Sequence, residues 1–196
     1  LKLIANSGSG VDHIDVATAR SRGILVSNTP GTVTDDTADM TLALILAVTR
    51  RIPEGLALMQ AGKWEGWSPM NLLGGRVGGR RLGILGMGRI GADVARRLEG
   101  FGMHIAYSAR SAKPLPYSYI SDPVALAEHA DFLVVTALAN AETHHIVNAD
   151  VLRALEGLGA AARARTGGIT KAAPTQAKRD RIAVPGVLWQ APCGRA

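Results

Sequence analysis

The sequence of 196 residues is long enough for one sizeable hydrophobic core, or for one domain and part of another. A hydrophobic content of 47% excludes a disordered chain, and the single cysteine, Cys193, excludes a disulfide scaffold and fits a reducing compartment such as the cytoplasm. The net charge of +6 arises in residues 153–196, because residues 1–152 hold 14 basic and 14 acidic residues. The folded part of the chain is therefore not expected to bind nucleic acid.

The first thirty residues alternate between strand and helix patterns. Residues 1–5 and 24–26 are short apolar runs typical of strands, and residues 11–22 between them indicate a short helix. This order is the beginning of a βαβ unit. Because the chain begins inside the first strand, we expect its native start to lie upstream, so the absence of a visible signal peptide carries little weight.

A stronger helix pattern follows, with Thr34 as its candidate N-cap and Asp35 and Asp36 at the positive end of the helix dipole. The body of this helix, residues 38–48, is apolar nearly all round. That is typical of a helix buried on more than one side, either inside the fold or against another subunit. The longest apolar run, residues 42–48, is far too short to span a bilayer, so no membrane partner is expected.

Beyond a glycine-rich, irregular connection, strand and helix patterns alternate regularly up to residue 155. Strands are predicted over residues 82–85, 103–108 and 131–136, and helices over residues 90–99, 123–129 and 148–155. This βαβαβ order predicts an α/β protein with one half of a doubly wound parallel sheet. The pattern stops at residue 156, so no second half of the sheet is expected.

Three glycines stand at the junction of the first strand and helix of this half-sheet. Gly86, Gly88 and Gly91 have the G-x-G-x-x-G spacing within LGILGMGRIG. In this context Gly86 permits a tight turn, Gly88 lets a pyrophosphate approach the backbone, and Gly91 lets the helix pack closely on the strand. The N–H groups of Arg89 and Ile90 would then face the pyrophosphate. We interpret the turn as a dinucleotide site, with a ligand-free structural turn as the alternative.

The end of the second strand bears on the choice between NAD and NADP. An aspartate or glutamate there would bind the ribose hydroxyls of NAD, but the sequence has Tyr107-Ser108-Ala109-Arg110 and no carboxylate. A serine hydroxyl and an arginine suit a 2′-phosphate, which an acid would repel. We therefore predict that Ser108 and Arg110 favour NADP over NAD; the alternative is that Arg110 is merely solvated.

Several motifs occur in the order found in the D-isomer-specific 2-hydroxyacid dehydrogenases, and the sequence resembles this family over about residues 1–155. The motifs are GSGVDHID at residues 8–15, TDDTAD at 34–39, GKW at 62–64, LGILGMGRIG at 82–91, YSAR at 107–110, DFLVVTAL at 131–138 and ETHHIVN at 142–148. They look most like the glyoxylate/hydroxypyruvate reductase branch. The resemblance implies NAD(P)H-dependent reduction of a small 2-keto acid, and a homodimer joined through helix 35–50.

The resemblance also divides the chain. It implies that residues 1–31 are the end of a flavodoxin-like substrate domain and that residues 32–79 hold an interdomain, dimerisation helix and a linker. Residues 80–155 would be the first half of a Rossmann-type NAD(P)-binding domain. Residues 156–196 would be an atypical basic tail outside the family fold.

Five further site residues carry over from the family by position. Ser9 and Gly10 match the loop whose backbone N–H groups bind the substrate carboxylate. Thr37 matches a residue near the cofactor phosphates. Thr136 and Ala137 match the loop beside the adenosine, although the family usually has proline at the position of Ala137.

The family's catalytic arginine, glutamate and histidine lie after the position of Leu155, and we find no counterpart for them in this sequence. No Asn-x-x-Arg-Gly segment follows Glu156, and no histidine follows His145. We assign no catalytic role to Cys193, and no residues have metal-ligand spacing. We also assign no catalytic role to the five histidines, which are His13, His104, His129, His144 and His145.

The basic tail has two interpretations. It is either a segment that binds nucleic acid or an anionic surface, or a stretch translated from a shifted reading frame. For the chain as a whole, the alternative to a dehydrogenase is a catalytically inactive cofactor-binding or interaction module derived from that family. In either case we predict little or no activity for this chain alone, and half a sheet exposes an apolar edge that works against solubility.

Overall fold

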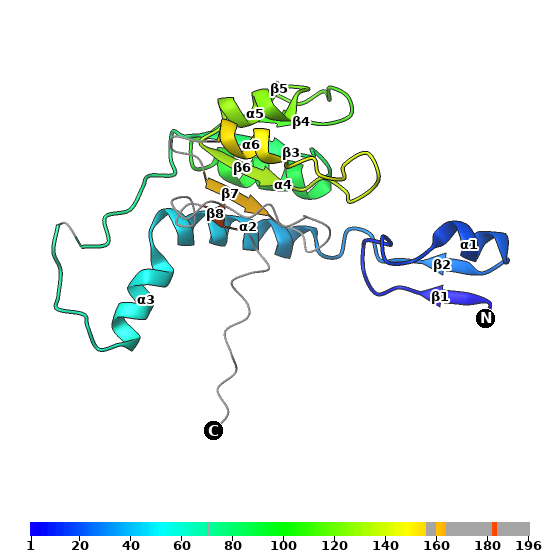
Figure 1. Cartoon of the computed structure of the whole chain (residues 1–196), viewed down its shortest axis with the longest axis horizontal. Coiled ribbons are helices and arrows are strands. Elements are labelled where there is room, and N and C mark those ends of the chain that lie inside the picture. Colours follow the sequence, from blue (N-terminus) through cyan, green and yellow to red (C-terminus); the bar gives the residue numbers. More distant parts are fainter. Residues whose placement is uncertain (70, 156–159, 164–181, 184–196) are drawn as a thin grey trace.

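The computed structural model describes residues 1–69, 71–155, 160–163 and 182–183, and within them two parallel sheets with helices (Figure 1). The helices are α1 (Val16–Ser21), α2 (Thr34–Thr49), α3 (Ile52–Gln60), α4 (Arg89–Glu99), α5 (Pro123–His129) and α6 (Ala149–Ala154). The strands are β1 (Leu3–Ala5), β2 (Leu25–Ser27), β3 (Arg81–Leu85), β4 (His104–Ser108), β5 (Ser118–Tyr119), β6 (Phe132–Val135), β7 (Ala160–Arg163) and β8 (Ile182–Ala183). This arrangement confirms the predicted α/β class.

The smaller sheet consists of β1 and β2, which pair in parallel and are connected through α1. The sequence predicted that this helix begins at residue 11, whereas it begins at Val16. The reason is the side chain of Asp15, whose carboxylate accepts a hydrogen bond from the N–H of Thr18 at 2.9 Å and so caps the helix.

The N-cap of the helix that follows, α2, lies one residue before the predicted one. Val33 is the N-cap and Thr34 is the first helical residue, because the N–H of Thr34 already turns back to the carbonyl of Gly31 at 3.2 Å. The prediction of Thr34 as N-cap is therefore wrong. Its buried residues, Ala38, Thr41 and Ile45, lie along one side, and Ala38 and Ile45 belong to the hydrophobic cluster with α4 and the sheet.

A second helix, α3, follows at once and was missed from the sequence. Arg51, between the two helices, has a left-handed backbone with φ of 55°, which ends α2 and turns the chain into α3. Left-handed backbone is normally signalled by glycine or asparagine, and neither stands here. The apolar side chains of Ile52, Leu56 and Met59 on α3 remain more than half exposed.

The larger sheet has the strand order β5-β4-β3-β6-β7-β8, with β3 between β4 and β6. Leu82 of β3 lies opposite Ile105 on one side and Phe132 on the other. Helices α2 and α4 cover one face of this sheet, and α5 and α6 cover the other (Figure 1). Helices on both faces make the arrangement doubly wound, as predicted.

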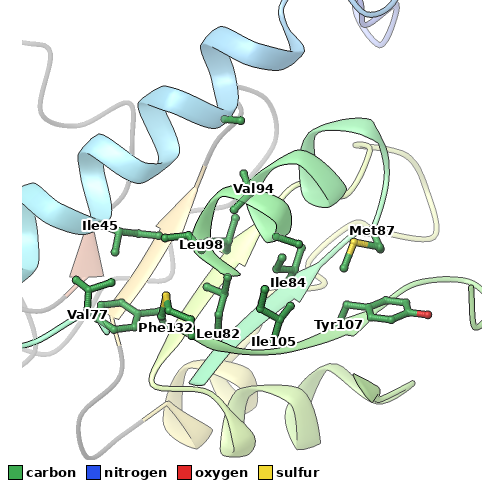
Figure 2. Packing of buried hydrophobic residues seen from close by; sticks show 14 residues of the cluster. Ile45, Val77, Leu82, Ile84, Met87, Val94, Leu98, Ile105, Tyr107 and Phe132 are labelled. Atoms are coloured by element: carbon green, nitrogen blue, oxygen red, sulfur yellow. The ribbon is translucent and has the colours of Figure 1, made fainter. Parts of the chain in front are cut away.

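A hydrophobic cluster joins α2 and α4 to the sheet (Figure 2). It brings Ile45 of α2 together with Val94 and Leu98 of α4, and with Leu82 and Ile84 of β3. All five are essentially fully buried. Burying a side chain of this size stabilises the fold by about 1.5–3 kcal/mol, so this cluster fixes where β3 ends and the glycine turn begins.

Three strands of the larger sheet were not predicted. The edge strand β5 is only two residues long, too short for a recognisable alternation pattern. β7 and β8 fall within residues 156–196, where no strand was expected, and that prediction is wrong for these two segments. The open edge of β6 offers a row of backbone N–H and C=O groups that pairs with extended chain whatever its hydrophobic pattern. The remaining residues of the predicted tail lie outside the described ranges.

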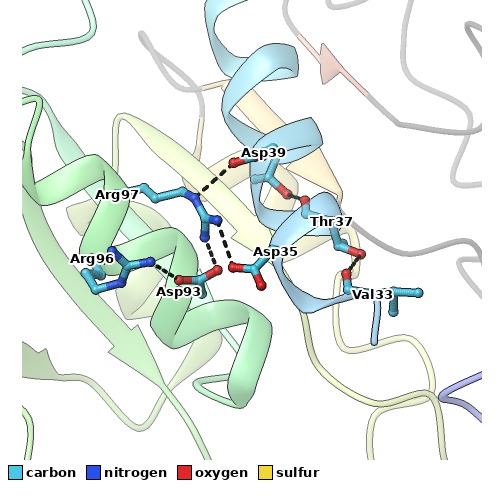
Figure 3. A network of polar contacts seen from close by, with 8 residues as sticks. Val33, Asp35, Thr37, Asp39, Asp93, Arg96 and Arg97 are labelled. Atoms are coloured by element: carbon cyan, nitrogen blue, oxygen red, sulfur yellow. Dashed lines mark hydrogen bonds and ion pairs between the residues drawn. The ribbon is translucent and has the colours of Figure 1, made fainter. Parts of the chain in front are cut away.

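A charged cluster around Arg97 links α2 to α4 (Figure 3). The Arg97 guanidinium lies 3.0 Å from a carboxylate oxygen of Asp35 and 3.0 Å from one of Asp39, both on α2. It also pairs with Asp93 within α4. The Arg97 side chain is only 18% exposed, so this contact ties α2 to the helix that begins at the glycine turn.

Replacing Arg97 by methionine is expected to lower the free energy of unfolding by about 2 kcal/mol, measured by urea denaturation. The apolar stem is retained, but three carboxylates lose their shared cation. The matched control is Arg96→Met, because Arg96 is 67% exposed and its one ion pair within the described ranges is with Asp93. That variant is expected to lose less than about 1 kcal/mol. Equal losses in the two variants would show that Arg97 does not join the helices.

A second ion pair aligns the starts of β3 and β6. The carboxylate of Asp131 accepts hydrogen bonds from the backbone N–H of Arg81 at 2.8 Å and from its guanidinium at 3.1 Å. In return the N–H of Asp131 donates to the carbonyl of Arg81 at 2.9 Å. The Arg81 hydrogen bonds hold the pKa of Asp131 below its ordinary value.

This shift predicts a loss of stability in acid. A carboxyl whose pKa is lowered by folding stabilises the protein above its unfolded pKa of about 3.9, and that contribution disappears as the pH falls through the folded pKa. Asp131→Asn is expected to lower the free energy of unfolding by about 1–3 kcal/mol at pH 7, with the difference from the parent shrinking below about pH 4. Asp150→Asn, in an exposed pair with Arg153, is the control. A difference independent of pH would contradict this role of Asp131.

Candidate functional site

The chain leaves β3 through Gly86, whose backbone has φ of +105°. The N–H of Gly86 donates to the carbonyl of Ser108 at 2.9 Å. A Cβ atom added to Gly86 would lie 2.4 Å from the N atom of Ala137 and 2.6 Å from its Cα. Both the backbone angle and the contact with the loop after β6 therefore require glycine here.

The third glycine of the motif, Gly91, lies in the first turn of α4. A Cβ atom on Gly91 would lie 2.3 Å from the carbonyl oxygen of Gly86 and 2.9 Å from Oγ1 of Thr136. The Thr136 hydroxyl also donates a hydrogen bond to that Gly86 carbonyl. Gly86, Gly91, Thr136 and Ala137 thus form one packed unit that holds the start of α4 against the ends of β3 and β6.

Gly88 differs from its two neighbours in the motif, because nothing lies within 4 Å of the place where its Cβ would stand. It is the N-cap of α4, and no side chain caps this helix. The N–H groups of Arg89 and Ile90 lie in the first helical turn, where an α-helix has no internal acceptors. Open space above Gly88 and free donors beside it fit the pyrophosphate of a dinucleotide.

Ser108 and Arg110, the two residues predicted to favour NADP through its 2′-phosphate, lie at the end of β4 and just after it. The Ser108 side chain is buried, and its hydroxyl donates to the carbonyl of Ser121 at 3.1 Å. Arg110 is exposed, as is Arg89, and within the described part of the chain neither forms an ion pair. The structure thus leaves two cations uncompensated, whereas the proton of the Ser108 hydroxyl is already engaged.

The loop of residues 7–10 is shaped by two asparagines that the sequence reasoning missed. The side-chain amide of Asn6 donates to the carbonyls of Gly8 and Gly10 at 2.9 and 2.8 Å, and that of Asn28 donates to the carbonyl of Ser9 at 2.9 Å. Carbonyls held in this way direct the peptide N–H groups to the other side of the loop. Asn6 directly follows β1 and Asn28 directly follows β2, a pairing that becomes visible only once the strands are paired.

The remaining predicted residue, Thr37, lies on α2, and its hydroxyl donates to the carbonyl of Val33. The structure brings Gly86, Gly91, Thr136 and Ala137 together. No hydrogen bond among the described residues joins Thr37 or the loop of residues 7–10 to them. Thr37 and the loop of residues 7–10 both precede the larger sheet in the sequence.

No group of three or more histidine, cysteine or acidic residues that could hold a metal ion occurs in the described ranges. The rings of His144 and His145 meet edge to face with centroids 3.9 Å apart, in the loop after β6. Cys193 lies outside the described residues. None of the described helices combines the length and the apolar character needed to cross a membrane.

Comparison with known proteins connects this turn to one family. The family model described as D-isomer specific 2-hydroxyacid dehydrogenase, NAD binding domain matches residues 42–159. A glyoxylate/hydroxypyruvate reductase of Arabidopsis thaliana is 42% identical over 156 residues, which are 79% of this chain and 48% of that protein. A glyoxylate reductase of Thermococcus litoralis is 42% identical over 164 residues, covering 80% of this chain and 50% of the relative.

Among solved structures, the chain is similar to an NADPH-dependent glyoxylate/hydroxypyruvate reductase from Sinorhizobium meliloti, in complex with NADP and malonate. The TM-score is 0.77 with 41% sequence identity, over 83% of this chain and 51% of that one. The chain thus spans about half the length of the relatives that it matches. With its glycine turn, its doubly wound sheet and this match, the chain belongs to the D-isomer specific 2-hydroxyacid dehydrogenase family and carries sequence of its NAD-binding domain.

Proposed function

We propose that the chain is the cofactor-binding portion of an NAD(P)H-dependent oxidoreductase that reduces a small 2-keto acid such as glyoxylate or hydroxypyruvate. The observation that carries this proposal is the turn from Gly86 to Gly91. Its first and last glycines are required for packing, whereas Gly88 leaves open space at the start of α4. A turn needed only for packing would not require that space.

The residues of the turn would bind the cofactor through its pyrophosphate. The N–H groups of Arg89 and Ile90 would donate to the phosphate oxygens, at the positive end of the α4 dipole. Thr136 and Ala137, which lie against Gly86, would border the adenosine, and Thr37 would lie near the phosphates. When bound, the cofactor supplies the hydride that reduces the keto group.

We propose further that the cofactor is NADP(H) in preference to NAD(H). Arg110 is exposed without an ion partner among the described residues and follows the strand whose end faces the adenosine ribose in this fold. Because the Ser108 hydroxyl already donates to Ser121, Arg110 would supply the charge, and Ser108 would leave room for the phosphate. The similar reductase from Sinorhizobium meliloti is NADPH-dependent, and its structure is a complex with NADP.

Arg110→Ala is expected to raise the Kd for NADPH about tenfold and to leave the Kd for NADH within about twofold of the parent value. The cause is the loss of one charge-assisted contact to a phosphate that NADH lacks. Both constants are measured by fluorescence titration of the nucleotide. Arg20→Ala, at an exposed position on α1, is the control. Parallel losses for both nucleotides would remove Arg110 from the 2′-site.

On the substrate side, the N–H groups of Ser9 and Gly10 would bind the carboxylate of the keto acid. These N–H groups share peptide planes with the carbonyls of Gly8 and Ser9, and both carbonyls accept hydrogen bonds from asparagine side chains, which fixes the two planes. Because these peptide groups are already ordered, they lose little conformational freedom when an anion binds. Asn6 and Asn28 would therefore act by holding this loop in shape.

We propose that the segments of the chain have the following roles. Residues 1–31 would close a substrate domain, residues 32–79 would link the domains and residues 80–155 would bind the cofactor. Residues 156–196 would be a tail outside the family fold, apart from β7 and β8, which extend the larger sheet. A homodimer would cover the side of helix 35–50 that one chain leaves exposed, including Met40, which is 58% exposed. The cytoplasm would suit a protein with one cysteine.

Thermal melts with each nucleotide test the proposal. NADPH is expected to raise the Tm of the chain, and NADH to raise it less at equal concentration. Turnover of glyoxylate or hydroxypyruvate by this chain alone is expected to be very low, since no counterpart of the family's catalytic arginine, glutamate and histidine is found in the sequence. A Tm unaffected by both nucleotides would overturn the cofactor site, and rapid NADPH oxidation would overturn the expected inactivity.

A further inference from the structure

The loop that carries Arg110, residues 109–117, connects β4 to the edge strand β5. None of its residues is buried, and the side chains of Arg110 and Lys113 are exposed. Ala109, Leu115 and Tyr117 pack against the hydrophobic cluster of α2, α4 and the sheet, but residues 110–114 between them are exposed and have few packing contacts to define their conformation. An arginine placed there would bind a phosphate well only if something else fixed the backbone.

Two tyrosines from the adjoining strands contact that backbone. The Tyr107 hydroxyl accepts a hydrogen bond from the N–H of Lys113 at 2.7 Å, and it lies 3.2 Å from the carbonyl oxygen of the same residue, to which it donates. The Tyr119 hydroxyl donates to the carbonyl of Ala109 at 3.2 Å. The loop is therefore tied on both sides of Arg110, directly before it and three residues after it.

Both tyrosines are held in place by the sheet. Tyr107 is fully buried and belongs to the hydrophobic cluster that joins α2 and α4 to the sheet, with its hydroxyl directed away from the labelled side chains of that cluster (Figure 2). Tyr119 lies opposite Tyr107 in the β4–β5 register, and the two ring centroids are 5.5 Å apart. Two hydroxyl groups held by paired strands thus fix the position of the loop backbone.

We propose that Tyr107 and Tyr119 are positioning residues for cofactor selection, which hold the Ala109–Lys113 backbone so that Arg110 meets the 2′-phosphate. This inference rests on the proposed function, where Arg110 binds that phosphate. A preformed loop loses less conformational freedom when the ligand binds. The gain applies to NADP(H) alone, because NAD(H) has no phosphate for Arg110 to contact.

Tyr119→Phe tests the inference, since it removes the hydroxyl and keeps the ring that contacts Tyr107. The Kd for NADPH is expected to rise about fivefold, and that for NADH to change by less than about twofold. Tyr117→Phe is the matched control. The Tyr117 hydroxyl belongs to the same loop but contacts Glu99 at 3.2 Å, so its removal is expected to leave the ratio of the two Kd values unchanged.

A measurement without nucleotide examines the loop itself. In Tyr107→Phe the N–H of Lys113 loses its acceptor, so its hydrogen exchange, followed by NMR, is expected to become about tenfold faster than in the parent. An unchanged ratio of Kd values in Tyr119→Phe, or unchanged exchange at Lys113 in Tyr107→Phe, would overturn the inference and leave the proposed function standing. A parent chain that binds neither nucleotide would overturn the proposed function, and the inference with it.

Discussion

Replacing Gly86 by alanine is expected to lower the free energy of unfolding by about 3 kcal/mol, measured by urea denaturation. Two costs add. The backbone angle φ of +105° is one that L-residues rarely adopt, and the new methyl group would lie 2.4 Å from the backbone N atom of Ala137. That atom belongs to the loop after β6, so it cannot move without disturbing the packing around Thr136.

The matched control for this substitution is Gly88→Ala, two residues further along the same turn. It adds the same atom where nothing lies within 4 Å and where φ is −86°. Its free energy of unfolding is expected to stay within about 1 kcal/mol of the parent value. Equal stability of the two variants would mean that the turn does not pass against the loop after β6.

The same Gly88→Ala variant is expected to bind NADPH about ten- to a hundredfold more weakly than the parent. Its methyl group would occupy the space that a pyrophosphate needs to reach the N–H groups of Arg89 and Ile90. Isothermal titration calorimetry measures the Kd, and circular dichroism verifies that the variant is folded.

Gly100→Ala provides the reference for this binding measurement. Gly100 is the C-cap at the other end of α4, so its substitution is expected to leave the Kd for NADPH unchanged. A folded Gly88→Ala variant that binds NADPH as tightly as the parent would show that the nucleotide does not lie over Gly88. Gly86→Ala and Gly88→Ala thus separate the packing role of the turn from its binding role.

Much of the larger sheet was predictable because its signals are local. The strand before Gly86 is buried on both sides and reads as an unbroken apolar run, and Val94 and Leu98 repeat on one side of α4. The helix over residues 123–129 was predicted with its observed bounds, because Asp122 and Pro123 mark its start. Each of these signals lies within a few residues of the element that it defines.

Other features depend on contacts between distant residues and left no local signal. Arg97 meets Asp35 across 62 positions of sequence, and Asn28 meets the carbonyl of Ser9 only because β2 pairs with β1. The break between α2 and α3 lies at Arg51, and an arginine gives no sequence signal for a left-handed backbone.

The candidate site, too, could be predicted from the sequence only in part. The spacing of the glycines predicted the turn itself, since each glycine answers a local requirement of backbone angle or close approach. The sequence also pointed to Ser108 and Arg110, but it gave no sign that the Ser108 hydroxyl donates to Ser121. Nor did it show that the Tyr107 hydroxyl reaches Lys113, which needs the folded course of the loop.

The most direct test is an NMR titration of the ¹⁵N-labelled chain with NADPH. If the turn holds the pyrophosphate and Arg110 the 2′-phosphate, the largest amide shifts are expected at Gly88, Arg89, Ile90 and Arg110. NADH should shift the first three and leave Arg110 nearly unchanged. Shifts absent from residues 86–91, or confined to α3, would contradict a dinucleotide site at the glycine turn.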